Sequence, residues 1–189
     1  MPRCLCCGEK FEKKYPTQIG KLRYCLLKDE CLKEFYKAVN ERKRRNEQRE
    51  WNITKKELKE KLKTKKDYEK ELERIFNKYI RLRDRNEPCI SCGAKAHTYK
   101  LTAGHYFPAG SYKNIRFDED NVHSQCWYNC NRSKSGNLIE YRVGLVGKIG
   151  TQRLEALEKR AREPRKYTIP ELIELKKYYK NKIKELTKN

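Results

Sequence analysis

The sequence is short of apolar residues. Only 37% of its 189 residues are hydrophobic, 39% are charged, and the mean hydropathy is -1.11. A single core running through the whole chain would lack the apolar side chains needed to offset the entropy of ordering it. The length suits one or two small domains. We therefore expect small compact units joined by long, solvated helices.

Long apolar runs are absent as well. No stretch approaches the roughly 18 apolar residues that a membrane-spanning helix requires. The start of the chain, Met1-Pro2-Arg3-Cys4, does not resemble an apolar targeting segment. The sequence therefore predicts a soluble, cytoplasmic protein with no membrane partner.

Acidic residues are few compared with basic ones. The chain has 26 Asp and Glu against 47 Lys and Arg, which gives a formal net charge of +21 and a pI near 9.6. Such an excess of positive charge predicts a polyanionic partner, and nucleic acid is the usual one. Charge alone does not separate DNA, RNA and an anionic lipid surface.

Cysteine, in contrast, is plentiful, with nine residues. In a reducing compartment, closely spaced cysteines are more often metal ligands than disulfides, and two four-ligand sites would use eight of the nine. Cys4-x-x-Cys7-Gly8 has the spacing of a zinc knuckle, and we pair it with Cys25 and Cys31 as one structural zinc site, leaving Cys6 spare. The alternative is two unrelated pairs of buried thiols.

A second knuckle, Pro88-Cys89-Ile90-Ser91-Cys92-Gly93, precedes a second pair, Cys126 and Cys130. Between them, the alternation of Ile115-Arg116-Phe117 predicts a short strand. Two cysteine pairs that flank a hairpin and a helix start form a treble-clef arrangement. There a second structural zinc ion takes over the work of a hydrophobic core.

The stretch from Leu26 to Arg85 lacks glycine and proline and is dense in Lys, Arg and Glu, so it is helical or disordered. A mainly polar helix should extend from the first zinc unit, and Thr54-Lys55-Lys56-Glu57 matches a capping box that would start a new helix. The basic part is either a solvated charged helix or a DNA-contacting arm. Apolar residues at 3- and 4-residue spacing predict an amphipathic helix over 66–84.

The C-terminal part is helical again. Thr168-Ile169-Pro170-Glu171 matches a capping box. The helix that follows places an apolar stripe on one side, which consists of Leu172, Leu175, Tyr179, Ile183 and Leu186. We expect this stripe to pack against the helix over 66–84. The alternative is the seam of a dimer.

The predicted fold class is therefore mainly α with small zinc-stabilised α+β units. Four parts follow along the chain: an N-terminal Cys4 zinc finger over 1–35, a basic helical segment over 36–85, a treble-clef finger over 86–137 and a C-terminal helical region over 138–189.

Between 86 and 137 the motifs become specific. A Gly-His pair, a loop, Asp-Asn-Val-His and Cys-x-x-x-Cys-Asn resemble the HNH, or ββα-metal, nuclease motif, in a version whose last His is Asn. More narrowly, the chain resembles the phage lambda NinG (Rap) recombination protein family. The segments that carry this resemblance are 88–93, Ala103-Gly104-His105-Tyr106, Ile115-Arg116-Phe117, Asn121-Val122-His123, Cys130-Asn131 and Lys134-Ser135-Gly136-Asn137.

The resemblance implies a phage recombination endonuclease that acts on branched DNA such as Holliday junctions and D-loops. In the HNH scheme His105 is the general base, Asn121 holds the loop and orients the base, and Asn131 offers its amide oxygen to a catalytic Mg2+ or Mn2+ ion. His123 is adjacent and is a candidate contact to the phosphate or the ion. The expected DNA contacts are Arg132, Lys134, Arg116 and Lys113.

One position departs from the HNH pattern. Many HNH enzymes have a metal-binding Asp just before the first His, and this chain has Gly104 there. The ion would then need another carboxylate, with Asp118, Glu119 and Asp120 as candidates, or more water molecules.

Several of these residues have simpler explanations. His105 could be a zinc ligand or a packed histidine, His123 could cap or pack, and His97 is expected to be exposed. Trp127 and Tyr128 could stack on an unpaired base, but such aromatics more often cover the zinc site.

Two functions of different class remain. The first is a metal-dependent, structure-selective DNA endonuclease, located in the host cell cytoplasm if the chain is phage-encoded. A symmetric four-way junction must be cut twice, which favours a homodimer. The alternative is a non-catalytic, zinc-dependent nucleic-acid-binding protein in which the cysteines only fold a basic surface.

Overall fold

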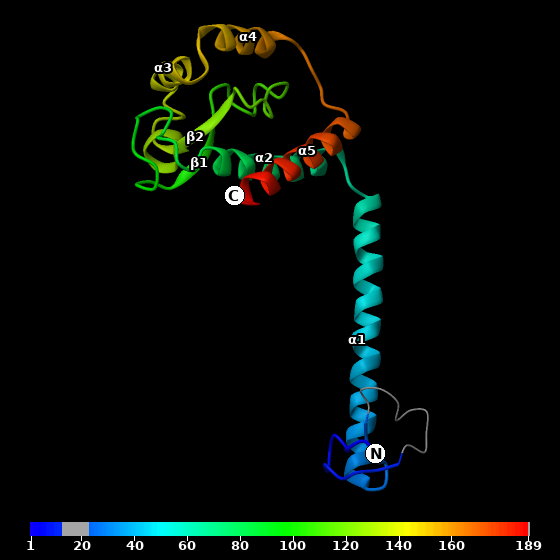
Figure 1. The fold of residues 1–189 in the computed structure, drawn as a ribbon. Helices are drawn as coiled ribbons and strands as arrows, with labels where there is room; N and C mark the ends of the chain where they lie inside the picture. The colour runs from blue at the N-terminus through cyan, green and yellow to red at the C-terminus, as the bar shows by residue number, and fades with distance from the viewer. Residues whose placement is uncertain (13–22, 189) are drawn as a thin grey trace. The chain divides into compact units, whose positions relative to one another are not determined.

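The computed structural model describes residues 1–12 and 23–188, in a chain that divides into two compact units, Met1–Leu62 and Lys63–Asn189 (Figure 1). The described residues are mainly helical, with one small two-stranded sheet. Each unit contains one group of four cysteines. The boundary between the units falls inside the predicted basic segment 36–85.

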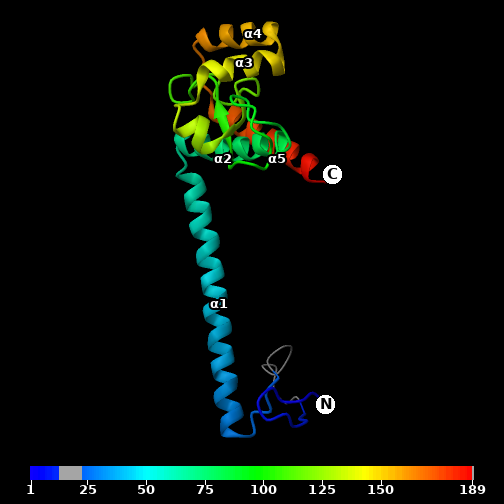
Figure 2. The ribbon, with the colours of Figure 1, turned by 90° about the vertical axis from the view of Figure 1, so that its left-hand side faces the viewer.

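The described residues of the first unit form the N-terminal cysteine group and one long helix, α1 (Asp29–Lys61) (Figures 1 and 2). Only Cys31 and Phe35 of α1 are buried, and both lie in its first two turns. They contact a small cluster around the cysteines, in which the Tyr24 and Phe35 rings meet edge to face at 6.0 Å. The predicted polar helix that extends from this cysteine group is thus confirmed.

The helix start predicted at Thr54 is wrong. Helix α1 continues through Thr54, whose hydroxyl donates to the Glu50 carbonyl oxygen at 3.1 Å. The next helix, α2 (Lys65–Arg83), is capped instead by Thr64, whose backbone N–H donates to the Asp67 carboxylate at 3.0 Å. The two segments have nearly the same local pattern. Apolar side chains after Thr64 pack in a core, whereas those around Thr54 are exposed, so only Thr64 begins a new element.

In the second unit, α2 packs against α5 (Ile169–Lys188) (Figures 1 and 2). The core between them includes Phe76 of α2 and Tyr179 of α5, whose rings lie edge to face at 4.9 Å. The predicted capping box is present, because the Thr168 N–H donates to the Glu171 carboxylate at 2.7 Å. The prediction that the apolar stripe of the last helix packs against the helix near 66–84 is therefore confirmed.

The sheet is a hairpin-like pair of antiparallel strands, β1 (Leu101–His105) and β2 (Val122–Cys126). Gly104 lies opposite His123, and His105 lies opposite Val122. Directly opposite residues of an antiparallel pair share a face of the sheet, and neighbours along a strand alternate between faces.

The two faces of this sheet therefore carry different residues. Val122 is part of the α2–α5 core, so its partner His105 lies on the face toward α2. Gly104, His123 and Gln125 lie on the opposite face. There the Tyr141 hydroxyl donates to the Gly104 carbonyl oxygen at 2.8 Å and accepts from the His123 N–H at 3.0 Å.

Tyr141 belongs to α3 (Leu138–Ile149), which forms a second core with α4 (Thr151–Arg162). The fully buried residues of this core are Tyr141, Leu145, Leu154 and Leu157, joined by Ile115. The hydroxyl of Tyr141 thus connects this second core to both strands of the sheet.

The strand predicted at Ile115-Arg116-Phe117 is wrong, because these residues form turns within the loop between β1 and β2. Their alternation has a different cause. Ile115 packs into the α3–α4 core and Phe117 into the α2–α5 core. Two buried side chains on either side of Arg116 mimic the pattern of a strand.

Candidate functional site

Four cysteine sulfurs converge in the second unit. Cys89 and Cys92 precede β1, Cys126 ends β2, and Cys130 lies in the π-helical turn η2 (Trp127–Arg132) that follows. The Cys89–Cys130 and Cys92–Cys126 Sγ–Sγ distances are 3.8 and 3.6 Å. A tetrahedral zinc ion with Zn–S bonds of about 2.3 Å places its sulfurs about 3.8 Å apart. The group therefore fits zinc, and four protein ligands leave no open position for chemistry.

Backbone N–H groups near this site favour the thiolate form of Cys89, which is the form that binds a metal ion. The Cys126 N–H donates to Cys89 Sγ at 3.3 Å. Burial opposes ionisation of the Cys89 thiol, but backbone N–H groups, led by that of Cys126, outweigh it and lower the pKa. Such hydrogen bonds to ligand sulfurs typically support a bound metal.

Ala94 and Tyr99 pack against these cysteines. Trp127 and Tyr128 have exposed fractions of 39% and 65%, and the covering role expected of them stays a prediction. The stacking interpretation of these two rings remains a prediction.

The first unit holds a second group with the same geometry. The Cys4–Cys31 and Cys7–Cys25 Sγ–Sγ distances are 3.8 and 3.9 Å, and all four ligand atoms lie within 4.8 Å of one another. Burial opposes ionisation of Cys4, but the backbone N–H groups of Cys7 and Cys25 outweigh it and lower its pKa to about 6. Cys6 is exposed and lies outside the group. Both predicted sets of four cysteines can thus hold a metal ion.

His105 ends β1 and is half-buried. Its Nε2 lies 3.1 Å from the Arg116 carbonyl oxygen. A carbonyl can only accept, so Nε2 carries the proton of the neutral ring and Nδ1 keeps the free lone pair. Burial, assisted by the nearby Arg116 charge, lowers the pKa of His105 below its ordinary 6.5. The ring is therefore neutral at neutral pH, which is the state that a general base requires.

Asn121 is fully buried and connects the two ends of the loop between the strands. Its Oδ1 accepts from the Phe107 N–H at 2.7 Å, and its Nδ2 donates to the Phe107 and Ile115 carbonyl oxygens, each at 3.2 Å. These three hydrogen bonds use both amide hydrogens and one of the two lone pairs of Oδ1. They hold the loop segment just before Arg116, whose carbonyl oxygen orients His105.

Asn131 lies in η2 and is half-buried. Its Nδ2 donates to Gln125 Oε1 at 3.0 Å. A Cβ atom on Gly104 would overlap this same Gln125 oxygen. The Asn131 amide is therefore hydrogen-bonded to the side chain that packs on Gly104. Gly104 is the residue before His105 in the chain. The side chains of His105 and Asn131 approach the end of β1 from opposite faces of the sheet.

His123 does not join this group. It is 3% exposed, and its Nδ1 is buried without a hydrogen-bond partner. Burial, together with the Arg83 and Lys148 charges, lowers its pKa to about 3. The packing interpretation therefore suits His123 better than a contact to phosphate. His97, as expected, is exposed.

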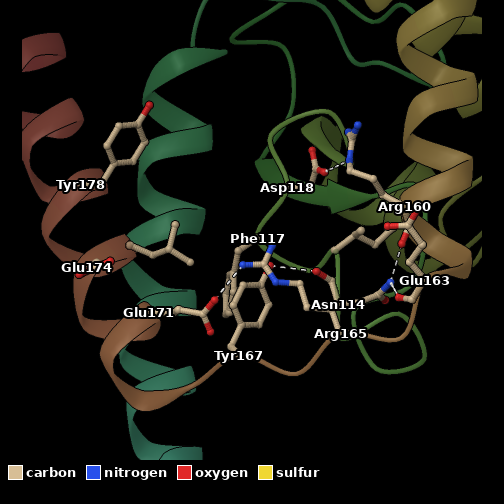
Figure 3. A pocket seen from close by; sticks show the side chains of 12 residues that line it. Asn114, Phe117, Asp118, Arg160, Glu163, Arg165, Tyr167, Glu171, Glu174 and Tyr178 are labelled. Carbon is tan, nitrogen blue, oxygen red and sulfur yellow. Dashed lines mark hydrogen bonds and ion pairs between the residues drawn. The ribbon is translucent and has the colours of Figure 1, made fainter.

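The three carboxylates considered as substitutes for the missing Asp all have partners. Asp118 accepts from Arg160 Nε at 2.8 Å, Asp120 pairs with the same guanidinium at 3.3 Å, and Glu119 accepts from the Tyr79 hydroxyl at 2.8 Å (Figure 3 shows the Asp118–Arg160 pair). Within residues 1–12 and 23–188, groups of three or more His, Cys, Asp or Glu able to hold an ion are confined to the two cysteine groups. These carboxylates are therefore not free to replace the Asp.

The Asp118–Arg160 pair lines a cavity of about 550 Å3 beside the connection between α4 and α5 (Figure 3). A second ion pair in its wall joins Arg165 to Glu171 at 3.0 Å. None of the predicted catalytic residues lines this cavity. It is therefore separate from the group around His105.

The predicted DNA contacts differ in their availability. Lys113, Arg132 and Lys134 are exposed, and none of them forms an ion pair within the described part of the chain. Arg116 is less available, since its guanidinium pairs with Glu73 at 3.1 Å and with Glu69 at 3.9 Å. Its role in the structure is to neutralise these α2 carboxylates next to His105.

Sequence reasoning missed Gln125, which is fully buried between Ser124 and the ligand Cys126. A buried amide must form hydrogen bonds, so a glutamine in a short strand next to a metal ligand is the signal that could have identified it. The Gln125 side chain packs beside Gly104, which the sequence marks only as a departure from the HNH motif.

These features define a mainly helical protein with a small two-stranded sheet and two four-cysteine groups that can bind zinc. The family model described as Bacteriophage Lambda NinG protein matches residues 1–189. The chain therefore belongs to the NinG family.

Curated relatives agree with this assignment. Protein ninG of Escherichia phage 933W is 40% identical over 117 residues, which cover 62% of this chain and 57% of the relative. Protein ninG of Escherichia phage lambda and that of Salmonella phage P22 are also each 40% identical over 117 residues, covering 62% of this chain and 56% of the relative. The match thus spans less than two thirds of these relatives. No solved structure matches the chain.

Among the described helices, none combines the length and the apolar character that crossing a membrane requires.

Proposed function

We propose that this chain is a metal-dependent, structure-selective DNA endonuclease that acts on branched recombination intermediates such as Holliday junctions and D-loops. The observation that carries the proposal is the state of His105. Its ring is neutral, its Nε2–H is held by the Arg116 carbonyl oxygen, and its Nδ1 has a free lone pair at the end of β1.

A base with this arrangement can take a proton from a water molecule that attacks a phosphodiester. Asn121 supports that role, because its three hydrogen bonds restrain the loop whose carbonyl oxygen orients the imidazole. The order of strand, loop, strand and helical turn, bound by Cys89, Cys92, Cys126 and Cys130, is consistent with an HNH-like, treble-clef finger.

Asn131 is the residue that would hold a catalytic ion, through its amide oxygen. A bound Mg2+ or Mn2+ would stabilise the negative charge that develops on the phosphate and on the leaving oxygen. With Gly104 in place of an Asp, and with Asp118, Glu119 and Asp120 paired, water and the DNA phosphate must supply most other ligands.

DNA binding is supported by the net charge of +21 and by the exposed side chains of Lys113, Arg132 and Lys134. A four-way junction is symmetric and needs two cuts, so we include a homodimer in the proposal.

The proposal is tested with purified chain, Mg2+ or Mn2+, and a panel of duplex, flap, D-loop and four-way DNA. We expect nicking of the branched substrates. His105→Ala should lower the rate by about 100-fold or more, in line with the usual contribution of a general base, while junction binding without added Mg2+ or Mn2+ is unchanged. The matched control is His97→Ala, because His97 is exposed and its ring lies 3.4 Å from the Asn86 side-chain oxygen, away from the predicted catalytic residues. Equal cutting by His105→Ala and the native chain would exclude His105 as the base.

The alternative is a zinc-dependent nucleic-acid-binding protein without catalysis. It is favoured by one observation: no group of three ionisable ligands accompanies His105 in the described residues. It predicts junction binding whose log K falls by about 0.9 per phosphate contact on a log salt scale, with no cutting at any divalent ion concentration. Divalent-dependent cutting that His105→Ala abolishes would reject this alternative.

A further inference from the structure

The buried Gln125 side chain packs beside Gly104 and also forms three hydrogen bonds. Resting on the proposed function, we propose that Gln125 is a positioning residue that fixes the Asn131 amide so that its oxygen, not its nitrogen, is presented to the divalent ion and the phosphate.

The argument begins at a backbone carbonyl group. Gln125 Nε2 donates to the Gly136 carbonyl oxygen at 2.6 Å and to the Ser91 hydroxyl at 2.7 Å. A carbonyl oxygen accepts and cannot donate, so the amide nitrogen of Gln125 must face Gly136. Gln125 is 0% exposed, and turning its amide over would leave two oxygens in contact without a proton between them.

This orientation is passed on to Asn131. With Nε2 toward Gly136, the Gln125 Oε1 atom points toward Asn131 and can only accept. Asn131 must therefore donate through Nδ2, which it does at 3.0 Å. Its Oδ1 then lies on the other side of the amide. No hydrogen bond within residues 1–12 and 23–188 uses Asn131 Oδ1, and Asn131 is half-buried, so this oxygen is available to a ligand.

Gly104 is part of the same arrangement. A Cβ atom at position 104 would overlap Gln125 Oε1 and lie only 2.9 Å from Gln125 Cβ. Any side chain on residue 104 would thus displace the amide that orients Asn131. Position 104 therefore cannot carry a carboxylate while Gln125 occupies this space.

The test compares the native chain with Gln125→Met, which keeps a side chain of similar length and loses all three hydrogen bonds. Supporting residues behind a metal ligand typically contribute 10- to 100-fold in metal affinity or activity. We expect the Mn2+ concentration for half-maximal cutting to rise by about that factor, with zinc content and junction binding without added Mn2+ unchanged. The matched control is Gln152→Met, at an exposed glutamine of α4. Unchanged Mn2+ dependence in folded Gln125→Met would overturn the proposal.

If Gln125→Met fails to fold, Ser91→Ala takes its place. This variant removes one of the two acceptors that hold Gln125 Nε2 and should raise the Mn2+ requirement less, in the same direction; an unchanged requirement counts against the proposal.

A second readout does not depend on cutting. The side-chain NH2 of Asn131, assigned by its loss in Asn131→Asp, should exchange slowly with D2O in the native chain and rapidly in Gln125→Met or Ser91→Ala. Rapid exchange in the native chain would contradict the proposed orientation. Slow exchange without any cutting would instead retain the orientation and reject the nuclease.

Discussion

A polar side chain can bind water, an ion or a phosphate only through atoms that no hydrogen bond within the protein already uses. At His105 the Arg116 carbonyl oxygen occupies Nε2, which leaves Nδ1 as the basic atom. At Asn121 the loop uses both amide hydrogens and one lone pair of Oδ1, and the residue is fully buried, so it acts as structural support. The same reasoning separates His123, which is buried with a strongly lowered pKa, from the candidate site.

The pH dependence of cutting should report His105. Protonation removes the base, so the rate falls as the pH drops through the pKa of this group. Burial lowers that pKa below 6.5, which places the acid limb of the profile below pH 6.5. The measurement is the nicking rate from about pH 5 to 8 at saturating Mn2+, with zinc content checked at each pH. A midpoint at or above 6.5 would contradict the assignment.

Between elements, α3 lies very close to the knuckle over 88–93. A Cβ on Gly144 would overlap the Ile90 carbonyl oxygen and lie 3.0 Å from its carbon. Ile90 is held in turn by its N–H, which donates to the Ser124 carbonyl oxygen of β2 at 3.0 Å. The helix, the knuckle and the sheet are thus packed backbone against backbone.

Two glycines of α3 allow a matched comparison. Gly144→Ala should destabilise the second unit by about 1–3 kcal/mol or more, because the obstacle is backbone and cannot rotate away. Gly147→Ala meets no atom within 4 Å and should stabilise the helix by up to about 1 kcal/mol. Urea denaturation of both variants measures this difference. Equal stabilities would mean that α3 does not contact the knuckle as described.

At the same scale, local patterns identified some elements and misplaced others. The Thr168 cap and the apolar stripe of α5 follow from the sequence, because both depend on residues within a few positions. The Thr54 start and the Ile115–Phe117 strand do not hold. A cap is used only where packing begins a new helix, and an alternating pattern becomes a strand only where a partner strand lies beside it.

For the whole molecule, two four-cysteine groups explain how a chain with 37% hydrophobic residues orders two separate units. Binding of structural zinc in finger peptides contributes roughly 10–16 kcal/mol, which is available as folding free energy. Outside the cysteine group, α1 has almost no buried residues, and its solvated face agrees with a basic composition.

The zinc content should follow the cysteines individually. The native chain is expected to hold two zinc ions, one for each group. Cys4→Ser and Cys89→Ser should each lower this to about one, since three sulfurs no longer complete a tetrahedral site. Cys6→Ser is the control and should retain both, because Cys6 lies outside the groups. Metal analysis after gel filtration gives the answer, and loss of an ion from Cys6→Ser would mean that the first group is misassigned.

By itself, the sequence determined the two groups of four cysteines, the amphipathic helices and the positive charge, because each depends on spacing or composition along the chain. The tertiary structure alone decided the rest. That Asp118 and Asp120 are bound to Arg160, that His105 and His123 lie on opposite faces, and that Gln125 fills the space beside Gly104 all depend on partners distant in sequence. A hydrogen bond or an ion pair uses up an atom's capacity to bind anything else, and only folding determines which atoms are used.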